Sequence, residues 1–261
     1  MTAQAIHEQA IIAPGARIAT SVSIGAYAII GEHVQLGEGC IVHPHAVITG
    51  PTIAGRNNIF HPFCSVGGDP QDLKFSGEET HLTIGDGNTF REYVTVSRGT
   101  VGGGGKTTIG SGSLFMAYAH IAHDCHIGNQ TIFANGATLA GHVSVDDFAT
   151  VGAFCPVHQF CRIGRYAYIG ASTVVTQDVP PFSRVVTERQ TNSYGINAVG
   201  LQRKGFSPER LVALKTAYRL LLRTKLNTSQ ALEQMKKTLA DSPDVKELIQ
   251  FIETAERGIV K

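Results

Sequence analysis

The feature that most constrains this chain is a period of six residues between Ile109 and Val175. Large apolar residues recur at every sixth position of this segment without a break. They are Ile109, Phe115, Ile121, Ile127, Phe133, Leu139, Val145, Val151, Val157, Ile163, Ile169 and Val175. A helix repeats about every 3.6 residues and an alternating strand about every 2. A sustained period of six therefore excludes both and predicts a repeat architecture.

The other positions of each six-residue unit are biased as well. The second residue is often Gly, Ala or Asp, and the fifth is mostly small. This pattern is typical of a triangular coil, in which each unit forms one short strand and a corner and the large side chain points into a prism. Three units close one coil, and stacked coils satisfy each other's backbone groups at a spacing of about 4.8 Å. Because no coil is stable alone, the array must be long. The sequence predicts an all-β parallel β-helix.

The repeat covers most of residues 1–190. It keeps one phase from Ile6 to Ile48, and after Ile48 we expect the phase to move to Ile53 and Ile59. The pattern is absent near residues 67–82 and 100–107, which we interpret as loop insertions. Insertions of a solenoid usually lie on one face and bind ligands. The second insertion contains four consecutive glycines without the spacing of a phosphate-binding loop, and we expect a flexible excursion there.

A small helical domain is predicted over residues 191–261. The repeat stops near Pro180-Pro181, and residues 182–204 have the pattern of a non-repetitive connection. Polar N-caps followed by proline then mark helix starts, and apolar residues recur at helical spacing. Three helices are predicted. The first begins at Ser207-Pro208, the second covers Ser229 to Leu239, and the third extends from Ser242-Pro243 to before Gly258.

Composition limits the class of protein. A formal net charge of +1 argues against a chain-wide nucleic-acid footprint. The sequence shows no apolar run near the roughly 18 residues that a membrane span requires. The first ten residues lack the basic and apolar regions of a secretory signal. We therefore expect a cytoplasmic protein that does not bind nucleic acid and is not an integral membrane protein.

The five cysteines are expected to be unpaired. Four of them occupy the small fifth position of a six-residue unit, where a thiol packs as a small apolar group. These four are Cys40, Cys125, Cys155 and Cys161. Packed thiols are favoured over disulfides, zinc ligands or a nucleophile.

Candidate catalytic residues gather where the repeat is most regular. Five of the eleven histidines lie there, at positions 120, 123, 126, 142 and 158. Coils of eighteen residues would stack Asp124 beside His142, and His123 beside Gly141. Large polar side chains are costly inside a prism, so we expect them to face outward onto a groove. Aligned polar residues on consecutive coils indicate a candidate site.

Two chemistries fit this cluster. Closely spaced histidines could give Zn²⁺ three nitrogen ligands, as in a zinc hydratase built on the same fold. Alternatively, one imidazole could act as a general base that takes a proton from a hydroxyl as the hydroxyl attacks a thioester. Asp124 would then fix the tautomer of its neighbour. A scaffold without catalysis gives no reason for the aligned histidines.

Seven segments carry a more specific pattern. They are Gln71-Asp-Leu-Lys74, Arg98-Gly-Thr100, His120-Ile-Ala-His-Asp-Cys125, Ala137-Thr-Leu-Ala-Gly-His-Val-Ser-Val-Asp-Asp147, His158-Gln-Phe160, Gln177-Asp-Val-Pro-Pro181 and Arg203-Lys-Gly-Phe206. With these segments the chain resembles the UDP-N-acetylglucosamine O-acyltransferases, the first enzymes of lipid A assembly, over nearly its whole length. The resemblance implies a left-handed parallel β-helix with a small C-terminal α-helical domain. It also implies transfer of an (R)-3-hydroxyacyl chain from acyl carrier protein to the 3-hydroxyl of UDP-N-acetylglucosamine.

The resemblance also implies roles for individual residues. His123 would be the general base, Asp124 its orienting partner, and the Gly141 N–H a donor to the oxyanion. Substrate contacts would come from Asp72, Lys74, His120, His142, His158, Gln159, Gln190, Asn197 and Arg203. Ala171 would occupy the position that measures acyl-chain length, often Gly in enzymes that prefer long chains. The resemblance further implies a homotrimer and no resident cofactor, because the acyl group is carried on the phosphopantetheine of acyl carrier protein.

Four positions depart from the family pattern. Gln190, Val199 and Lys204 stand where His, Glu and Arg are expected, and Ser97 replaces a His. The first three belong to the expected uridine and phosphate contacts, whereas the segment around His123 is intact. Serine acetyltransferases and sugar acetyltransferases share the fold but take their acyl group from coenzyme A. The acyl donor therefore separates these rivals.

Overall fold

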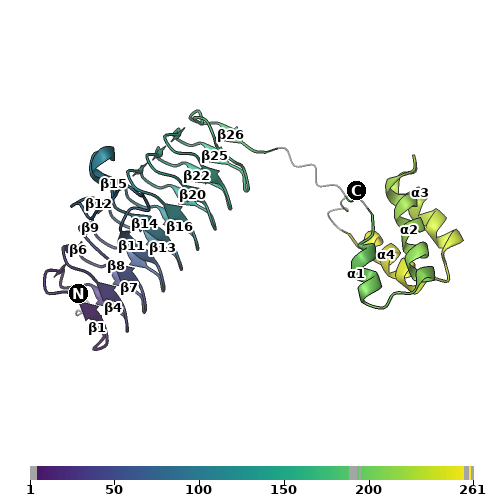
Figure 1. The fold of residues 1–261 in the computed structure, drawn as a ribbon, viewed down its shortest axis with the longest axis horizontal. Helices are drawn as coiled ribbons and strands as arrows, with labels where there is room; N and C mark the ends of the chain where they lie inside the picture. The colour runs from purple at the N-terminus through teal and green to yellow at the C-terminus, as the bar shows by residue number, and fades with distance from the viewer. Residues whose placement is uncertain (1–4, 188–192, 194, 256–258, 260–261) are drawn as a thin grey trace. The chain divides into compact units, whose positions relative to one another are not determined.

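The computed structural model describes residues 5–187, 193, 195–255 and 259. The chain forms two compact units, residues 1–187 and residues 188–261 (Figure 1). The sequence-based boundary between residues 190 and 191 lies outside the described residues. Each unit is described by itself.

The first unit is a parallel β-helix whose strands stack into three sheets (Figure 1). Sheet 1 consists of β1 (Ala5–Ile6), β4 (Ser23–Ile24), β7 (Ile41–Val42), β10 (Ile59–Phe60), β13 (Thr89–Phe90), β16 (Leu114–Phe115), β19 (Ile132–Phe133), β22 (Thr150–Val151), β25 (Tyr168–Ile169) and β26 (Arg184–Val185). Sheet 2 consists of β2 (Ile11–Ile12), β5 (Ile29–Ile30), β8 (Val47–Ile48), β11 (Ser65–Gly68), β14 (Thr95–Ser97), β17 (His120–Ile121), β20 (Thr138–Leu139) and β23 (Pro156–Val157). Sheet 3 consists of β3 (Arg17–Ile18), β6 (Val34–Leu36), β9 (Thr52–Ala54), β12 (His81–Ile84), β15 (Lys106–Ile109), β18 (His126–Ile127), β21 (Ser144–Val145) and β24 (Arg162–Ile163).

The strand register confirms the predicted coil of eighteen residues. In sheet 2, His120 pairs with Thr138 and Ile121 with Leu139, and all neighbouring strands of the sheet are parallel. From Ile24 to Val175 the inward residue of each unit is buried, whereas Ile6 at the open end of the prism is 40% exposed. Inside the prism four phenylalanine rings stack with centroids 4.9–5.1 Å apart, at positions 60, 90, 115 and 133. Close packing of this column excludes water from the core of consecutive coils.

The predicted change of phase after Ile48 is wrong. The inward positions continue in the original phase through Ala54 and Phe60, and both side chains are buried. Ile53 instead points outward from sheet 3 and is 47% exposed. The small Ala54 occupies an inward position beside a larger isoleucine, and side-chain size alone made Ile53 the better candidate.

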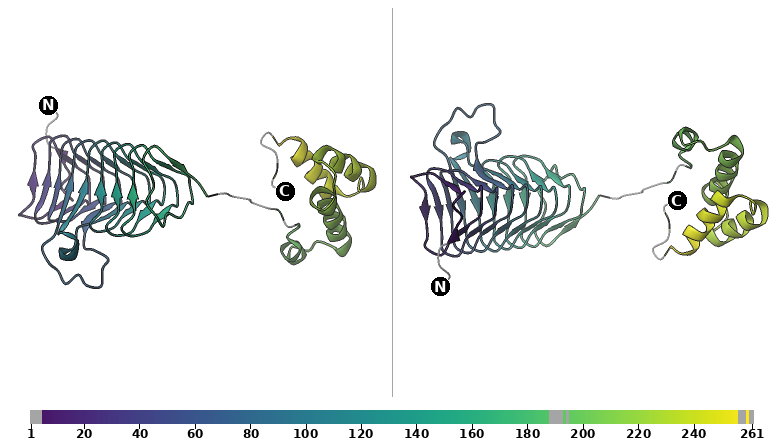
Figure 2. Two further views of the ribbon diagram at one scale, coloured as in Figure 1. Left: turned by 90° about the horizontal axis from the view of Figure 1, so that it is seen from above. Right: turned by 90° about the horizontal axis from the view of Figure 1, so that it is seen from below.

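Both insertions leave the same corner of the prism, between sheet 2 and sheet 3. Residues 69–80 connect β11 to β12, and residues 98–105 connect β14 to β15 (Figure 2). The second segment contains a short 3₁₀ helix, η1 (Val101–Gly103), whose N-cap Thr100 accepts a hydrogen bond from the Gly103 N–H. The expected flexible excursion is therefore a capped turn with defined contacts.

The second unit is helical and consists of α1 (Ala198–Arg203), α2 (Pro208–Leu222), α3 (Thr228–Thr238) and α4 (Pro243–Glu253). The predicted caps Ser207 and Ser242 are confirmed, because each accepts a hydrogen bond from an N–H in the first turn. Buried apolar residues of α2, α3 and α4 form its core. Of the stretch expected to be irregular, residues 182–204, β26 continues sheet 1 and α1 is helical. None of the helices in the described residues has the length and apolar character that crossing a bilayer requires.

Candidate functional site

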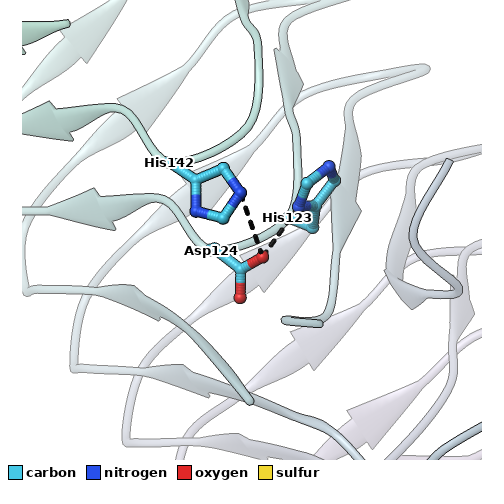
Figure 3. Close-up of side chains that lie close together, drawn as sticks. All are labelled: His123, Asp124 and His142. Carbon is cyan, nitrogen blue, oxygen red and sulfur yellow. Dashed lines mark hydrogen bonds and ion pairs between the residues drawn. The ribbon is translucent and has the colours of Figure 1, made fainter. Parts of the chain in front are cut away.

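The candidate site lies at the corner between sheet 2 and sheet 3, on two consecutive coils (Figure 3). His123 and Asp124 follow β17, and His142 follows β20. Asp124 and His142 have φ angles of 60° and 63°, in the left-handed region that Asp and His tolerate better than most residues. The His142 N–H donates to the His123 carbonyl at 3.0 Å, which fixes the register of the two corners. The repeat thus brings these three side chains together.

The three side chains form a compact polar cluster. His123 Nδ1 lies 2.7 Å from Asp124 Oδ2, and His142 Nε2 lies 3.8 Å from the same oxygen (Figure 3). The two imidazole rings meet edge to face with centroids 5.2 Å apart. Asp124 is only 2% exposed, and of the three side chains only His123 and His142 line a groove.

Hydrogen bonds from the turn at residues 100–107 explain how a carboxylate is buried here. Thr100 donates its backbone N–H to Asp124 Oδ1 at 2.8 Å and its hydroxyl to Oδ2 at 2.6 Å. The Asp124 N–H donates to the Thr107 hydroxyl at 2.8 Å. A buried carboxylate is tolerated when its oxygens accept such bonds. Sequence reasoning missed Thr100 as a site residue, although its segment Arg98-Gly-Thr100 was visible as a motif.

Two grooves flank the cluster. The first has a volume of about 480 Å³ and is lined by Gln71, His120, Ala122, His123, Thr138, Leu139, Ala140, Gly141, Pro156, Val157, His158, Val174, Val175 and Thr176. The second has a volume of about 370 Å³ and is lined by Asp72, Lys74, Phe75, Glu78, Thr100, Val101, Gly102, His142 and Phe160. The first groove has a largely apolar floor, supplied by the outer face of sheet 2, which sequence reasoning did not identify. The insertion at residues 69–80 contributes to both.

The remaining predicted site residues are more dispersed. Gln159 is exposed beside His158, whose Nδ1 lies 3.1 Å from the Gln159 carbonyl oxygen. Ala171 is exposed at a different corner, after β25 of sheet 1, and lines neither groove. Asn197 and Arg203 belong to the helical unit, as the N-cap and the last residue of α1. Gln190 lies outside the described residues.

Gly141 is the point where the second coil approaches the imidazole of His123. A Cβ atom on Gly141 would lie 2.6 Å from Cε1 and 2.8 Å from Nε2 of His123. Only glycine allows this approach without moving the ring. Within the described residues the Gly141 N–H donates no hydrogen bond, and it borders the first groove. It is therefore free to bind an acceptor there.

His120 lines the first groove as a half-buried imidazole. Its Nδ1 lies 2.7 Å from the Thr95 hydroxyl oxygen. Burial lowers the pKa of His120, and the nearby His123 lowers it further. The environment therefore favours the neutral form of this side chain.

The cysteines are buried and free, as predicted. Cys125 follows Asp124 directly but points into the prism, where its thiol donates to the Ala140 carbonyl at 3.3 Å. Burial raises the pKa of the Cys125 thiol to about 12. The thiol is therefore protonated near neutral pH and is a poor nucleophile.

The same three side chains are also spaced closely enough to ligate a metal ion. One ligand atom each of His123, Asp124 and His142 lies within 4.8 Å of the others. However, Asp124 Oδ2 already accepts from Thr100 and faces His123 Nδ1, and Oδ1 accepts from the Thr100 N–H. A metal bound there would have to compete with these bonds. The arrangement favours an imidazole that is oriented by a carboxylate over a metal centre.

Family comparisons cover both units. Residues 178–260 match the family described as "Udp N-acetylglucosamine O-acyltransferase; Domain 2". Residues 21–50 and 106–141 match the family described as bacterial transferase hexapeptide, six repeats.

Individual relatives match along the whole chain. The acyl-[acyl-carrier-protein]–UDP-N-acetylglucosamine O-acyltransferase of Thermodesulfovibrio yellowstonii is 52% identical over 98% of this chain and 99% of its own. The protein of the same name from Xylella fastidiosa is 50% identical over 99% and 98%. Among solved structures, LpxA of Acinetobacter baumannii is 42% identical with a TM-score of 0.68, covering 98% of this chain and 99% of its own. The Francisella novicida UDP-N-acetylglucosamine acyltransferase is 36% identical with a TM-score of 0.69, over 98% and 93%.

Proposed function

The chain belongs to the acyl-[acyl-carrier-protein]–UDP-N-acetylglucosamine O-acyltransferase family of lipid A biosynthesis, and from this premise we propose its detailed reaction. The enzyme transfers an (R)-3-hydroxyacyl chain from the thioester of acyl carrier protein to the 3-hydroxyl of UDP-N-acetylglucosamine. The observation that carries the proposal is the His123–Asp124 pair at the edge of a groove, with the free Gly141 N–H beside it.

His123 acts as the general base. When its Nδ1–H donates to Asp124, the lone pair of Nε2 is left to accept a proton. As the sugar hydroxyl attacks the thioester carbonyl, Nε2 takes the hydroxyl proton and a carbon–oxygen bond forms. The carbon–sulfur bond then breaks, and the imidazolium returns the proton to the leaving thiolate. The products are the ester and the free thiol of acyl carrier protein.

Gly141 stabilises the intermediate. The tetrahedral carbon formed by the attack carries a negative oxygen, and an N–H donor prepared for it lowers the barrier by about 3 kcal/mol. The Gly141 N–H satisfies the two requirements of such a donor, since it has no other acceptor among the described residues and lies beside the base.

The substrate contacts follow from the two grooves. His120 and His158 meet the substrate in the first groove, with Gln159 at its rim, and the apolar floor receives the acyl chain. Asp72, Lys74 and His142 meet it in the second. The family pattern, and not the grooves, assigns Gln190, Asn197 and Arg203 to the nucleotide end and Ala171 to the measurement of acyl-chain length.

We further propose that three copies of the chain assemble. An exposed column of stacked rings runs along the corner between sheet 1 and sheet 2, with centroids 4.9–5.3 Å apart. It consists of Tyr27, His45, Phe63, Tyr93 and Tyr118. The outward residues of sheet 3 are instead largely polar. An exposed apolar edge indicates an interface. Because the first groove lies on sheet 2, a second copy packed on this edge supplies its missing wall.

Sedimentation velocity tests the assembly. Phe63→Glu places a charge in the ring column and should reduce the trimer and the activity together. Ile53→Glu is the matched control, because Ile53 is a similarly exposed apolar residue on sheet 3. It should leave the trimer intact. A wild-type monomer with full activity would contradict this proposal.

Mass spectrometry of the product tests the reaction. The purified enzyme is given UDP-N-acetylglucosamine and a panel of acyl carrier protein thioesters with different chain lengths, with and without the 3-hydroxyl. We expect an ester of the 3-hydroxyacyl donors and none from acetyl coenzyme A. A rate that vanishes with a zinc chelator and returns with zinc would favour the metal chemistry instead.

A further inference from the structure

The segment Arg98-Gly99-Thr100 begins the loop at residues 98–105 and contacts both Asp124 and the insertion at residues 69–80. We propose that this segment positions the catalytic pair: Thr100 holds the carboxylate of Asp124, and Arg98 anchors the insertion at residues 69–80 to the same backbone. The inference rests on the proposed role of His123. It assigns Thr100 and Arg98 as positioning residues that act through Asp124 and the insertion, respectively.

Thr100 controls the orientation of the carboxylate. Its N–H and its hydroxyl bind different oxygens of Asp124, at 2.8 and 2.6 Å. Two donors from one residue fix the plane of the carboxylate, and Oδ2 then faces His123 Nδ1 at 2.7 Å. Thr100 and Asp124 are both buried, so water does not replace these bonds readily. Partners of this kind determine how well a catalytic imidazole is aligned.

The turn that follows Thr100 closes tightly on the same carboxylate. A Cβ atom on Gly103 would lie 2.1 Å from Asp124 Cγ, so only glycine fits between turn and carboxylate. The Gly103 N–H donates to the Thr100 carbonyl at 3.0 Å, which closes the turn. The φ angle of 93° at Gly104, in the left-handed region, ends it. The shape of the turn is thus matched to a carboxylate at position 124.

Arg98 connects the same backbone to the insertion. Its guanidinium donates to the Gly67 carbonyl at 2.8 Å and to Asp69 Oδ1 at 2.5 Å, and its N–H donates to the Gly68 carbonyl at 2.9 Å. The Phe75 ring centroid lies 5.9 Å from its guanidinium carbon. These contacts hold the insertion where it leaves β11, ahead of the residues that line both grooves.

Stability alone does not explain this arginine. Arg98 is buried, and among the described residues its Nε has no hydrogen-bond partner. A buried guanidinium with an unpaired N–H costs free energy that an apolar side chain would not.

Between the two anchors, the Gly99 N–H donates to the His81 carbonyl at 3.3 Å, and a Cβ atom on Gly99 would lie 2.1 Å from the Lys106 nitrogen. The segment is therefore held rigidly at its centre.

Thr100→Val tests the first half of the proposal, because it keeps the shape and the N–H but removes the hydroxyl. We expect kcat to fall about tenfold with the KM for UDP-N-acetylglucosamine within about twofold, since alignment and not binding is impaired. Thr100→Ser should restore most of kcat. The control is Thr131→Val, which removes a buried hydroxyl bonded to Ser113 at 2.8 Å, away from the site. If Thr100→Val does not fold, Thr100→Ala replaces it.

Asp69→Ala tests the second half without disturbing the core, because Asp69 is exposed. It should raise the KM for UDP-N-acetylglucosamine about fivefold, because the insertion loses its ion pair with Arg98. Glu79→Ala is the control, an exposed carboxylate in the same insertion. The double variant Asp69→Ala/Thr100→Val should lose less kcat/KM than the product of the single losses, because both loosen one segment.

The outcomes separate this inference from the proposed function. If Thr100→Val loses no more kcat than Thr131→Val, the positioning role is wrong, while an inactive His123→Ala still supports the base. If the losses of the double variant multiply fully, the two anchors are independent and the coupling is wrong. If His123→Ala keeps its turnover, the general base is wrong and the positioning role has no basis.

Discussion

The same corner of the prism occurs in two versions, one in the first coils and one at the site. In the first coils, sheet 2 passes to sheet 3 through residues such as 31–33, between β5 and β6. In this early corner, Glu32 occupies the position that His123 has in the later coil. The next residue, His33, occupies the position of Asp124 and has a φ angle of 62°. His33 is exposed and has no carboxylate partner among the described residues.

The backbone of this corner is therefore not what makes the site. The left-handed φ angle recurs at His33, Asp124 and His142 with a spread of a few degrees, 60–63°. What differs is that two loops, residues 69–80 and 98–105, leave the corner on the coils just before His123. They bury a carboxylate and provide its hydrogen-bond donors. A repeat fold supplies many equivalent corners, and added loops convert one of them into the candidate site.

The largest difference between the two versions should appear in turnover. His123→Ala removes the proposed general base and should lower kcat by about 10²–10⁴-fold, with little change in sugar-nucleotide binding. Glu32→Ala removes the side chain at the equivalent position of the early coil and should leave kcat unchanged. Steady-state kinetics on both variants checks this. Near-normal turnover of His123→Ala would mean that the two corners do not differ in the way proposed.

Glycine substitutions should separate stability from activity. A Cβ at Gly141 meets the movable ring of His123 at 2.6 Å, whereas a Cβ at the equivalent Gly50 meets the Glu32 carbonyl oxygen at 2.5 Å. A ring can turn away and a backbone cannot. Gly141→Ala should therefore lower kcat roughly 10- to 100-fold by displacing His123, the proposed base. Gly50→Ala should instead lower the free energy of unfolding by about 1–3 kcal/mol and leave kcat unchanged.

Thermal or denaturant unfolding, measured beside kcat, checks the glycine pair. The ranking should invert between the two measurements: Gly50→Ala is the less stable variant and Gly141→Ala the less active one. If both variants lose stability and activity in parallel, the close approach at Gly141 serves packing and not alignment of the base.

The scaffold was predictable from the sequence because it follows from a period. Six-residue spacing fixes which side chains point inward and stacks Asp124 on His142. The spacing rule fails at Ile53, where the larger side chain suggested the wrong inward residue. It also fails where a loop determines the surroundings of a side chain. The burial of Asp124 depends on Thr100, which belongs to a non-repetitive turn, and no spacing rule relates the two residues. The apolar floor of the first groove could not be predicted either, because in the sequence Pro156 and Val174 look like ordinary outward residues of the repeat.

Buried sulfur should matter equally in both halves of the prism. Cys125→Ala and Cys40→Ala each delete one buried sulfur and should lower the free energy of unfolding by about 1 kcal/mol through a small cavity. Both should keep kcat, because the Cys125 thiol points into the core and burial raises its pKa to about 12. Loss of activity in a folded Cys125→Ala protein would make this thiol catalytic.

The smallest expected effect is on the free energy of unfolding at acid pH. It concerns two histidines, His61 in the early half of the prism and His120 at the site. Burial is the main cause that lowers the pKa of each, assisted at His61 by the stacked His43 and at His120 by His123. The unfolded chain therefore takes up protons, near pH 6.5 for an ordinary imidazole, that the folded chain resists. The contribution of each histidine to stability is complete above that pH and is lost as the pH falls below it.

His61→Gln and His120→Gln should both flatten the acid-side decline of the free energy of unfolding, measured by denaturant titration at several pH values. Only His120→Gln should also raise the KM for UDP-N-acetylglucosamine, because only this histidine lines the groove. An equal rise for His61→Gln would extend the binding surface to the early coils and remove the distinction between the two halves.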